Sequence, residues 1–356
     1  MTITMRRTLL TALAILATSL TSQAQEVKNI IYLIGDGMGL TSASMMQIEN
    51  KYEPTIFDMA ENIALQKSYS LDNRVTDSAA SGTALATGHK TNNTMLGMLP
   101  DGTVVESLME VASANGKATG LVVTTYIQHA TPGAFYAHVP SRNEYATISE
   151  QLLASDIDIA IGGGMAFFEE RYGSRESAIK AITASGFTLK ECLDTFVDGE
   201  RVLALLSPKE IEERTGYLAK ATAEAIDHLD NCDNGFVLMV EGSLIDGMGH
   251  ANDAKGQQQE MRDFMEAIEV AVAYAKAHPE TLVVVTADHG TGGLTIISGN
   301  ADFTLSEQGV EYNWATHGHS GEMVPIYLYG TGAELINGIM ENADLGKRLI
   351  ELVQQR

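Results

Sequence analysis

TLVVVTADHG, residues Thr281–Gly290, places a continuous run of apolar and β-branched residues directly before Asp288 and His289. An uninterrupted run of this kind is typical of a strand buried on both faces, as in a parallel sheet covered by helices. The same pattern recurs in Asn29–Gly35 (NIIYLIG) and Phe236–Val240 (FVLMV). We therefore expect these three runs to be strands of one mostly parallel sheet.

Strand and helix patterns alternate along the rest of the chain. Apolar runs predict strands at Ala118–Thr125, Ile157–Ile161, Thr281–Ala287 and Val324–Tyr329, and helical patterns occupy Ser107–Asn115, Glu144–Leu153, Glu210–Leu229 and Gln257–Ala277. This order predicts an α/β fold: a single domain over residues 25–356, with a central, mostly parallel sheet flanked by helices on both faces. The stretch from about residue 165 to 215 is less regular, as is typical of a lid or an insert.

The composition excludes one class of partner. Hydrophobic residues at 45% and charged residues at 19% are typical of an ordinary globular core. The chain has 23 Lys and Arg residues against 46 Asp and Glu residues, a formal net charge of −23 at pH 7. Because a protein that binds nucleic acid needs a basic surface to neutralise phosphates, we expect no binding to a nucleic-acid polymer.

Residues 1–24 have the pattern of a signal peptide. Arg6 and Arg7 precede the apolar stretch Leu9–Leu20, which is too short to span a bilayer, and small residues stand at Ser22 and Ala24. The alternative is an uncleaved anchor. We expect the segment to be removed and the product to be exported, periplasmic or secreted, with no membrane attachment after cleavage.

The chain has two cysteines, Cys192 and Cys232. In an oxidising compartment they can form a disulfide, provided that their geometry permits it, and the sequence leaves this open. They do not make a zinc site by themselves, because no second pair of cysteines is present.

Carboxylates stand where the predicted strands end. Asp36 follows the run that begins at residue 29, and Glu241 follows FVLMV. Asp288, with His289 beside it, follows TLVVVTA. The carboxyl ends of parallel strands meet at one edge of an open α/β sheet, so we expect these groups to converge there. Adjacent carboxylates repel one another unless a cation lies between them, which points to metal ions.

A second group comprises Asp246 and His250 in EGSLIDGMGH and His319 in HGHSGEMVP. A spacing of four can place Asp246 and His250 on one face of a helical turn, where they can share a metal ion. Zinc binds imidazole and carboxylate, whereas magnesium prefers oxygen ligands, so these donors suggest zinc at the histidines and magnesium where only oxygens are available. A lone histidine is more often structural, and we interpret five in this way: His89, His138, His228, His278 and His317.

VTDSAASGTALATG, residues Val75–Gly88, surrounds Ser78 with small residues. Taken alone, the segment predicts the start of a helix, with Asp77 as its N-cap. A serine at a helix N-terminus is also well placed for phosphate chemistry, because the free N–H groups there face an anion. A nearby zinc ion could lower the pKa of the Ser78 hydroxyl and make it a nucleophile without a histidine base.

Six segments together resemble the alkaline phosphatase family. They are GDGMG, VTDSAASGTALATG, HATPGAFYAHVPSR, EGSLID followed by His250, TADHGTGG, and the HSG that contains His319. They occur in the family's order and cover most of the chain. The resemblance implies the α/β fold of that family, hydrolysis of small phosphate monoesters through a phosphoseryl intermediate, two zinc ions and one magnesium ion as cofactors, and a homodimer.

The resemblance also implies roles for individual residues. Ser78 matches the nucleophile, and Arg142 matches the guanidinium that holds two phosphate oxygens, in keeping with the forked geometry of arginine. The first zinc ion would be held by Asp246, His250 and His319, the second by Asp36, Asp288, His289 and Ser78, and magnesium by Asp36, Thr131 and Glu241.

Two positions depart from the pattern of the relatives. His129 stands where some bacterial members have an aspartate near magnesium and others a histidine, so we expect His129, like Asp77, beside the ligands, and zinc to compete for this third site. Gly247 follows Asp246 directly and replaces the Lys, His or Trp with which relatives contact phosphate. We expect phosphate to be released faster for want of that contact.

Two alternatives to a phosphomonoesterase remain. A phosphodiesterase of the same superfamily would lack the magnesium site, so Thr131 and Glu241 favour a monoesterase, and HVPSR has His138 where a sulfatase needs Cys or Ser. A non-catalytic periplasmic protein that binds an anion or a metal is compatible with export and acidity. However, the chain shows neither two similar lobes nor a hinge.

Overall fold

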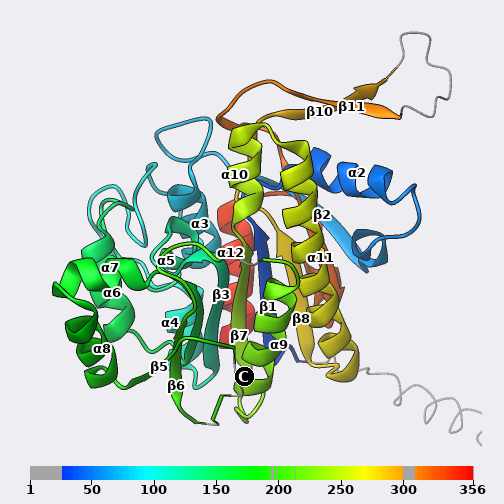
Figure 1. Cartoon of the computed structure of the whole chain (residues 1–356). Helices are drawn as coiled ribbons and strands as arrows, with labels where there is room; N and C mark the ends of the chain where they lie inside the picture. Colours follow the sequence, from blue (N-terminus) through cyan, green and yellow to red (C-terminus); the bar gives the residue numbers. More distant parts are fainter. Residues whose placement is uncertain (1–25, 194–195, 198, 213, 300–308, 356) are drawn as a thin grey trace, which may run out of the picture.

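A computed structural model of the chain describes residues 26–193, 196–197, 199–212, 214–299 and 309–355 (Figure 1). The expected signal peptide at residues 1–24 lies outside these residues. Within them, ten strands form the main sheet: β1 (Asn29–Gly35), β2 (Asn62–Lys67), β3 (Ala118–Tyr126), β4 (Ile159–Gly163), β5 (Phe187–Lys190), β6 (Arg201–Leu205), β7 (Phe236–Gly242), β8 (Thr281–Thr286), β13 (Val324–Gly330) and β14 (Gly338–Glu341).

The strand order is β14-β2-β13-β8-β1-β7-β3-β4-β6-β5. β13 runs antiparallel to both of its neighbours, β8 and β2, and the other paired strands of this sheet run parallel. The predicted α/β class with a mostly parallel sheet is therefore confirmed. The three runs that precede the strand-end acids are the adjacent strands β8, β1 and β7.

Helices cover both faces of the sheet (Figure 1). They are α2 (Leu40–Glu49), α3 (Ser78–Thr87), α4 (Leu108–Ala114), α5 (Ala130–Gly133), α6 (Tyr145–Ala154), α7 (Met165–Tyr172), α8 (Arg175–Ala184), α9 (Tyr217–Leu229), α10 (Leu244–Ala251), α11 (Ala254–Ala277) and α12 (Asn342–Gln354), with the short 3₁₀ turns η1 (Ile56–Met59) and η2 (Ala333–Leu335). α9 and α11 pack on one face, and α3, α4 and α12 lie over the other.

The strands of the sheet centre have continuous apolar sequences because helices cover both of their faces. Along β1, Ile30, Tyr32 and Ile34 belong to the core under α3, α4 and α12, whereas Ile31 and Leu33 belong to the core under α9 and α11. Because successive side chains of a strand point to opposite faces, a strand covered on both sides needs an apolar residue at every position.

Two small antiparallel pairs lie outside the main sheet. β9 (Gly290–Thr291) pairs with β12 (His319–Ser320), and β10 (Leu294–Ser298) pairs with β11 (Val310–Trp314) in a hairpin that extends away from the sheet (Figure 1). The β9–β12 pair matters for the site, because it places His319 opposite Thr291.

Several predicted boundaries differ from the structure. The helix predicted at Glu210–Leu229 begins only at Tyr217, because Gly216 has a left-handed backbone (φ 69°) that a continuous helix does not allow. The strand predicted at Ile157–Ile161 lies two residues later, as β4. β2 and β14 were not predicted, and the burial pattern of β2 alternates because its outer side faces solvent.

The stretch from about residue 165 to 215 is more regular than its sequence indicates. It contains α7, α8, β5 and β6, and β5 and β6 extend the main sheet beyond β4. The described part of this stretch is therefore continuous with the main sheet. Here, as elsewhere in the described part of the chain, no helix combines the length and apolar character needed to cross a bilayer.

The cysteines are not joined in this structure. Cys232 is present as a thiol, whose Sγ lies 3.4 Å from the carbonyl oxygen of Gly116, and Cys192 is exposed. The pairing that the sequence left open is therefore not formed.

Candidate active site

The three strand-end acids lie close together at one edge of the sheet. Asp36 follows β1, Glu241 is the penultimate residue of β7, and Asp288 comes two residues after β8. β1 pairs with both β7 and β8, and all three carboxyl side chains are fully buried. The sheet thus gathers acids from three distant parts of the sequence at one place.

Among the described residues, three groups of side chains could each hold a metal ion, because the ligand atoms within each group lie within 4.8 Å of one another. We name them the rim group (Asp246, His250, His319), the buried group (Asp36, Asp288, His289) and the third group (Asp36, His129, Glu241). Asp36 belongs to two groups. His129, which the sequence places beside the ligands, thus lies among the possible ligands of the third group.

Thr131, the remaining expected ligand, lies on α5 and is fully buried. Its hydroxyl lies near the Glu241 carboxylate and acts to lower the pKa of that group, but it makes no hydrogen bond of good geometry among the described residues. A buried hydroxyl without a partner is costly, so an additional group, such as a cation, would compensate it.

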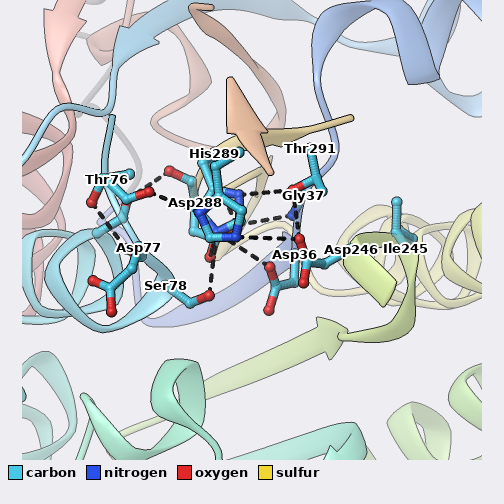
Figure 2. A network of polar contacts seen from close by, with 12 residues as sticks. Asp36, Gly37, Thr76, Asp77, Ser78, Ile245, Asp246, Asp288, His289 and Thr291 are labelled. Carbon is cyan, nitrogen blue, oxygen red and sulfur yellow. Dashed lines mark hydrogen bonds and ion pairs between the residues drawn. The ribbon is translucent and has the colours of Figure 1, made fainter. Parts of the chain in front are cut away.

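His289 is the centre of the buried group (Figure 2). Its Nε2 lies 3.2 Å from Asp288 Oδ2, 3.6 Å from Asp36 Oδ1 and 3.2 Å from the Oγ of Ser78. Its Nδ1 lies 3.3 Å from the hydroxyl of Thr291. Burial lowers the pKa of His289 well below its usual value, so the ring is neutral, as a metal ligand must be.

The rim group is built by α10 and β12. Asp246 and His250 are four residues apart on α10, and His250 Nε2 lies 3.2 Å from Asp246 Oδ2. The Nδ1 of His250 contacts the carbonyl of His317, and the Nδ1 of His319 lies 2.8 Å from the carbonyl of Thr76. A backbone carbonyl on one ring nitrogen orients the other nitrogen, here toward Asp246, which is the usual arrangement behind a metal-binding histidine.

Burial makes the clustered carboxylates costly to ionise. It raises the pKa of Asp36 well above its usual value, with repulsion from Asp288 adding to the effect, and raises the pKa values of Glu241 and Asp288 to about 8 and about 7. Both oxygens of Asp36, Oε1 of Glu241 and Oδ2 of Asp288 have no hydrogen-bond partner in the described part of the chain. Such a cluster fits divalent cations, which would offset both the repulsion and the burial.

Ser78 is the first residue of α3. Asp77 is the N-cap, as predicted: its side chain accepts a hydrogen bond of 2.9 Å from the backbone N–H of Ala80. The Ser78 hydroxyl is buried and points to His289 (Figure 2). A nucleophilic oxygen here would face an anion held in front of the first turn of the helix.

Two contacts hold Arg142, one with Asp77, the residue before Ser78, and one with His129. Its Nη1 lies 3.3 Å from Asp77 Oδ2, and its Nη2 donates to His129 Nε2 at 3.0 Å. Burial, and then the charge of Arg142, lower the pKa of His129 to about 3, so His129 accepts this bond as a neutral ring. Asp77 and His129 therefore orient the guanidinium, which remains partly exposed.

Two residues support the site through hydrogen bonds that no sequence pattern predicts. The Thr291 hydroxyl donates to Asp246 Oδ1 and also contacts His289, so it joins the rim group to the buried group. The Ser81 hydroxyl donates to the carbonyl of Asp288 at 2.6 Å and accepts a bond of 3.0 Å from Asn342, the first residue of α12.

Histidines that the sequence analysis interprets as structural form hydrogen bonds that connect neighbouring segments. His138 contacts the carboxylate of Glu110 and the carbonyl of Gly97, both at 2.9 Å, and His228 contacts the carbonyl of Glu200. The Nδ1 of His317 likewise contacts a carbonyl, that of His250, at 2.9 Å, and the carbonyl of His317 in turn contacts the ring of His250. Its part could not have been read from a side-chain pattern, since any residue has a carbonyl.

Comparison with known proteins identifies the family. The family model described as "Alkaline phosphatase" matches residues 27–186 and 188–309. The chain belongs to the alkaline phosphatase family. Alkaline phosphatase 3 of Bacillus subtilis (strain 168) is 33% identical over 92% of this chain and 89% of its own length. Alkaline phosphatase of Escherichia coli (strain K12) is 31% identical over 89% and 84%.

Solved alkaline phosphatase structures share the fold. The enzyme from the Antarctic bacterium TAB5 superposes with a TM-score of 0.87 at 34% identity, covering 94% of this chain and 100% of that chain. A cold-active alkaline phosphatase from a psychrophilic Shewanella sp. gives 0.85 at 29% identity, covering 92% and 100%.

The protein is therefore a metal-dependent hydrolase of small phosphate monoesters. The alternatives weighed from the sequence, a phosphodiesterase and a non-catalytic periplasmic binding protein, have no support in these comparisons. The alkaline phosphatase fold and the three groups of candidate ligands agree with each other, because the groups lie at the carboxyl ends of the central strands.

Proposed function

We propose that this alkaline phosphatase transfers the phosphoryl group of a monoester first to Ser78 and then to water. The supporting observation is the buried Ser78 hydroxyl at the start of α3, 3.2 Å from His289 Nε2. The Ser78 oxygen forms a bond to phosphorus while the ester oxygen leaves, and the hydroxyl proton ends on the alcohol. A water oxygen then displaces Ser78 from phosphorus and releases inorganic phosphate.

Arg142 binds two phosphate oxygens in this proposal. Each of its terminal nitrogens carries two N–H groups, and the contacts with Asp77 and His129 engage one nitrogen each. The remaining N–H groups can form the parallel pair of bonds that arginine makes to phosphate. Asp77 and His129 act as positioning residues for this fork.

Zinc is proposed for the rim group and for the buried group. Asp246, His250 and His319 would hold one zinc ion, and Asp36, Asp288 and His289, together with Ser78, would hold the other. When bound, such ions lower the pKa of coordinated oxygens and stabilise charge on a transferring phosphoryl group. The donor chemistry supports this assignment, because each group combines imidazole with carboxylate.

Magnesium is proposed for the third site, with Asp36, Glu241 and Thr131 as oxygen ligands and His129 alongside. Because His129 lies within ligand distance of Asp36 and Glu241, we infer that zinc competes with magnesium there, in exchange for the bond that His129 accepts from Arg142. One solved TAB5 mutant, in which a histidine is replaced by aspartate, has Mg bound in its M3 site. This supports control of the third ion by the balance of nitrogen and oxygen ligands.

Export and assembly are also proposed. The charge and length pattern of residues 1–24 supports cleavage and a periplasmic or secreted product, and the family resemblance supports a homodimer. N-terminal sequencing of the protein from culture fractions tests the first. Light scattering during gel filtration tests the second.

The test of the reaction is the Ser78→Ala variant, assayed with p-nitrophenyl phosphate. We expect kcat/KM to fall by at least about 10³-fold, while elemental analysis finds cations still bound. Ser70→Ala is the matched control, because Ser70 is also buried and its hydroxyl donates to a carboxylate, that of Asp72, outside the site. Full activity in Ser78→Ala would disprove the proposed nucleophile.

A further inference from the structure

Ser243 lies two residues after Glu241, just beyond the end of β7. Its hydroxyl donates a short hydrogen bond of 2.6 Å to Glu241 Oε2. Ser243 is 5% exposed and Glu241 is fully buried, so water does not compete for this bond. One oxygen of the carboxylate is thus engaged by a fixed donor.

The neighbouring strand holds Ser243 in place. The backbone N–H of Ser243 donates to the hydroxyl of Thr124 on β3 at 2.9 Å, and Thr124 is only 1% exposed. β3 pairs with β7, with Val123 opposite Glu241. Thr124, Ser243 and Glu241 therefore form a buried chain of hydrogen bonds anchored in the sheet.

The other oxygen of Glu241 is left for a different partner. Oε1 has no hydrogen-bond partner among the described residues, and a Glu241 carboxylate oxygen lies within 4.8 Å of ligand atoms of Asp36 and His129. If the carboxylate were free to rotate about its last bond, it would lose this orientation, and the unsatisfied oxygen would not be held toward the third group.

We propose that Ser243 is a positioning residue for the third cation site: its hydroxyl fixes the Glu241 carboxylate so that one oxygen binds the protein and the other binds the ion. This inference rests on the proposed third site. A hydrogen bond behind a metal ligand orients that ligand, and its removal commonly costs about 10- to 100-fold in metal affinity.

The experiment measures magnesium binding directly. Full-length protein is dialysed to equilibrium against graded Mg²⁺ at a fixed low zinc concentration, and its magnesium content is determined by elemental analysis. We expect Ser243→Ala to raise the half-saturating Mg²⁺ concentration by about tenfold or more. Ser243→Thr, which keeps the hydroxyl, should return it to within about threefold of the parent, and kcat of Ser243→Ala should recover at saturating Mg²⁺.

Two controls separate the possible failures. Ser70→Ala also removes a hydroxyl that donates to a carboxylate, and it should leave magnesium binding unchanged. Glu241→Gln should abolish the magnesium equivalent. If it does not, the third site itself is wrong, and this inference fails with it.

If Glu241→Gln loses magnesium but Ser243→Ala binds it within twofold of the parent, the third site stands and the role of Ser243 is overturned. An equal loss in Ser70→Ala would overturn it as well, because the effect would then be a general one. Should Ser243→Ala fail to fold, Ser243→Cys, which keeps the size but weakens the donor, must still weaken magnesium binding for the inference to hold.

Discussion

The buried group and the rim group offer the same kinds of ligand but are built by different parts of the fold. The buried group stands at the ends of the adjacent strands β1 and β8, and Asp36, Asp288 and His289 are fully buried. In the rim group, the side chains of Asp246 and His319 are 17% exposed and that of His250 is 42% exposed.

Because of this difference, the buried group is held more rigidly and the rim group is more accessible to solvent. The centre of the sheet fixes the buried group, and its ligands cannot move without disturbing two cores. The rim group depends on the eight-residue helix α10 and on the two-residue strand β12, which open at a lower cost than central strands. We therefore expect the buried group to hold its ion longer and the rim group to admit water.

Substitution of a ligand gives the largest expected effect. Asp36→Asn should lower kcat/KM for p-nitrophenyl phosphate by well over about 100-fold and remove cations from two groups, because Asp36 belongs to both the buried and the third group. Asp246→Asn should remove one cation. Elemental analysis of both variants provides the measurement, and a greater cation loss in Asp246→Asn would reverse the comparison.

Chelation tests the difference in access. A chromogenic chelator should remove cations in at least two phases, with the rim group emptied faster than the buried group by about tenfold or more. In Asp246→Asn the fast phase should disappear, since that variant lacks an intact rim group. A single phase in the parent protein would mean that the two groups open together.

The stability of the metal-stripped protein should depend on pH in a direction set by the buried acids. The pKa values of Glu241 and Asp288, about 8 and about 7, lie above the unfolded values near 4. Between pH 4 and pH 8 these two carboxyls bind more protons in the folded state than in the unfolded state, so their contribution to the free energy of unfolding falls as pH rises. His129 and His289, whose pKa values are lowered, act in the opposite direction at the acidic end of this range, so the carboxyls decide the sign toward pH 8.

Thermal melts at pH 5 and pH 8 measure this effect. The stripped protein should melt several degrees lower at pH 8, whereas the metal-loaded protein should show little of this fall, because bound cations compensate the carboxylates. Glu241→Gln should flatten the profile of the stripped protein. A stripped parent that is more stable at pH 8 would contradict the assigned protonation.

The smallest expected effect concerns phosphate release at the rim. A side chain at Gly247 would enter open space, so Gly247→Lys can place an ammonium beside Asp246 without a clash. We expect inhibition by inorganic phosphate to tighten by a few fold, with Gly247→Gln as the uncharged control. An unchanged inhibition constant would rule out the role given to this glycine.

The sequence predicts the buried group better than its surroundings. Asp36 and Asp288 follow apolar runs that are typical of buried parallel strands, so their place at one edge of the sheet can be predicted from local sequence. In the rim group, the spacing of four residues predicts that Asp246 and His250 lie on one face of a helix. The strands β2 and β14 were missed, because short strands near the sheet edge bury only part of their side chains.

The supports behind the ligands escape prediction for a different reason. The carbonyls of Thr76 and His317 orient two histidines, and every residue carries a carbonyl. The sequence predicts His129 beside the ligands, and only the three-dimensional structure shows that its ring also lies within reach of Asp36 and Glu241. These contacts depend on distances between segments that the sequence does not encode locally.

The bond from Asn342 to Ser81, and from Ser81 to the carbonyl of Asp288, has a consequence for the timing of assembly. During synthesis, the proposed nucleophile Ser78, Arg142 and most of the candidate ligands emerge before α12. The turn that carries Asp288 is braced by Ser81 of α3, and α12 supports that brace through the bond from Asn342 to Ser81. A chain that lacks α12 therefore carries most of the candidate site residues without the support that Asn342 gives to Ser81.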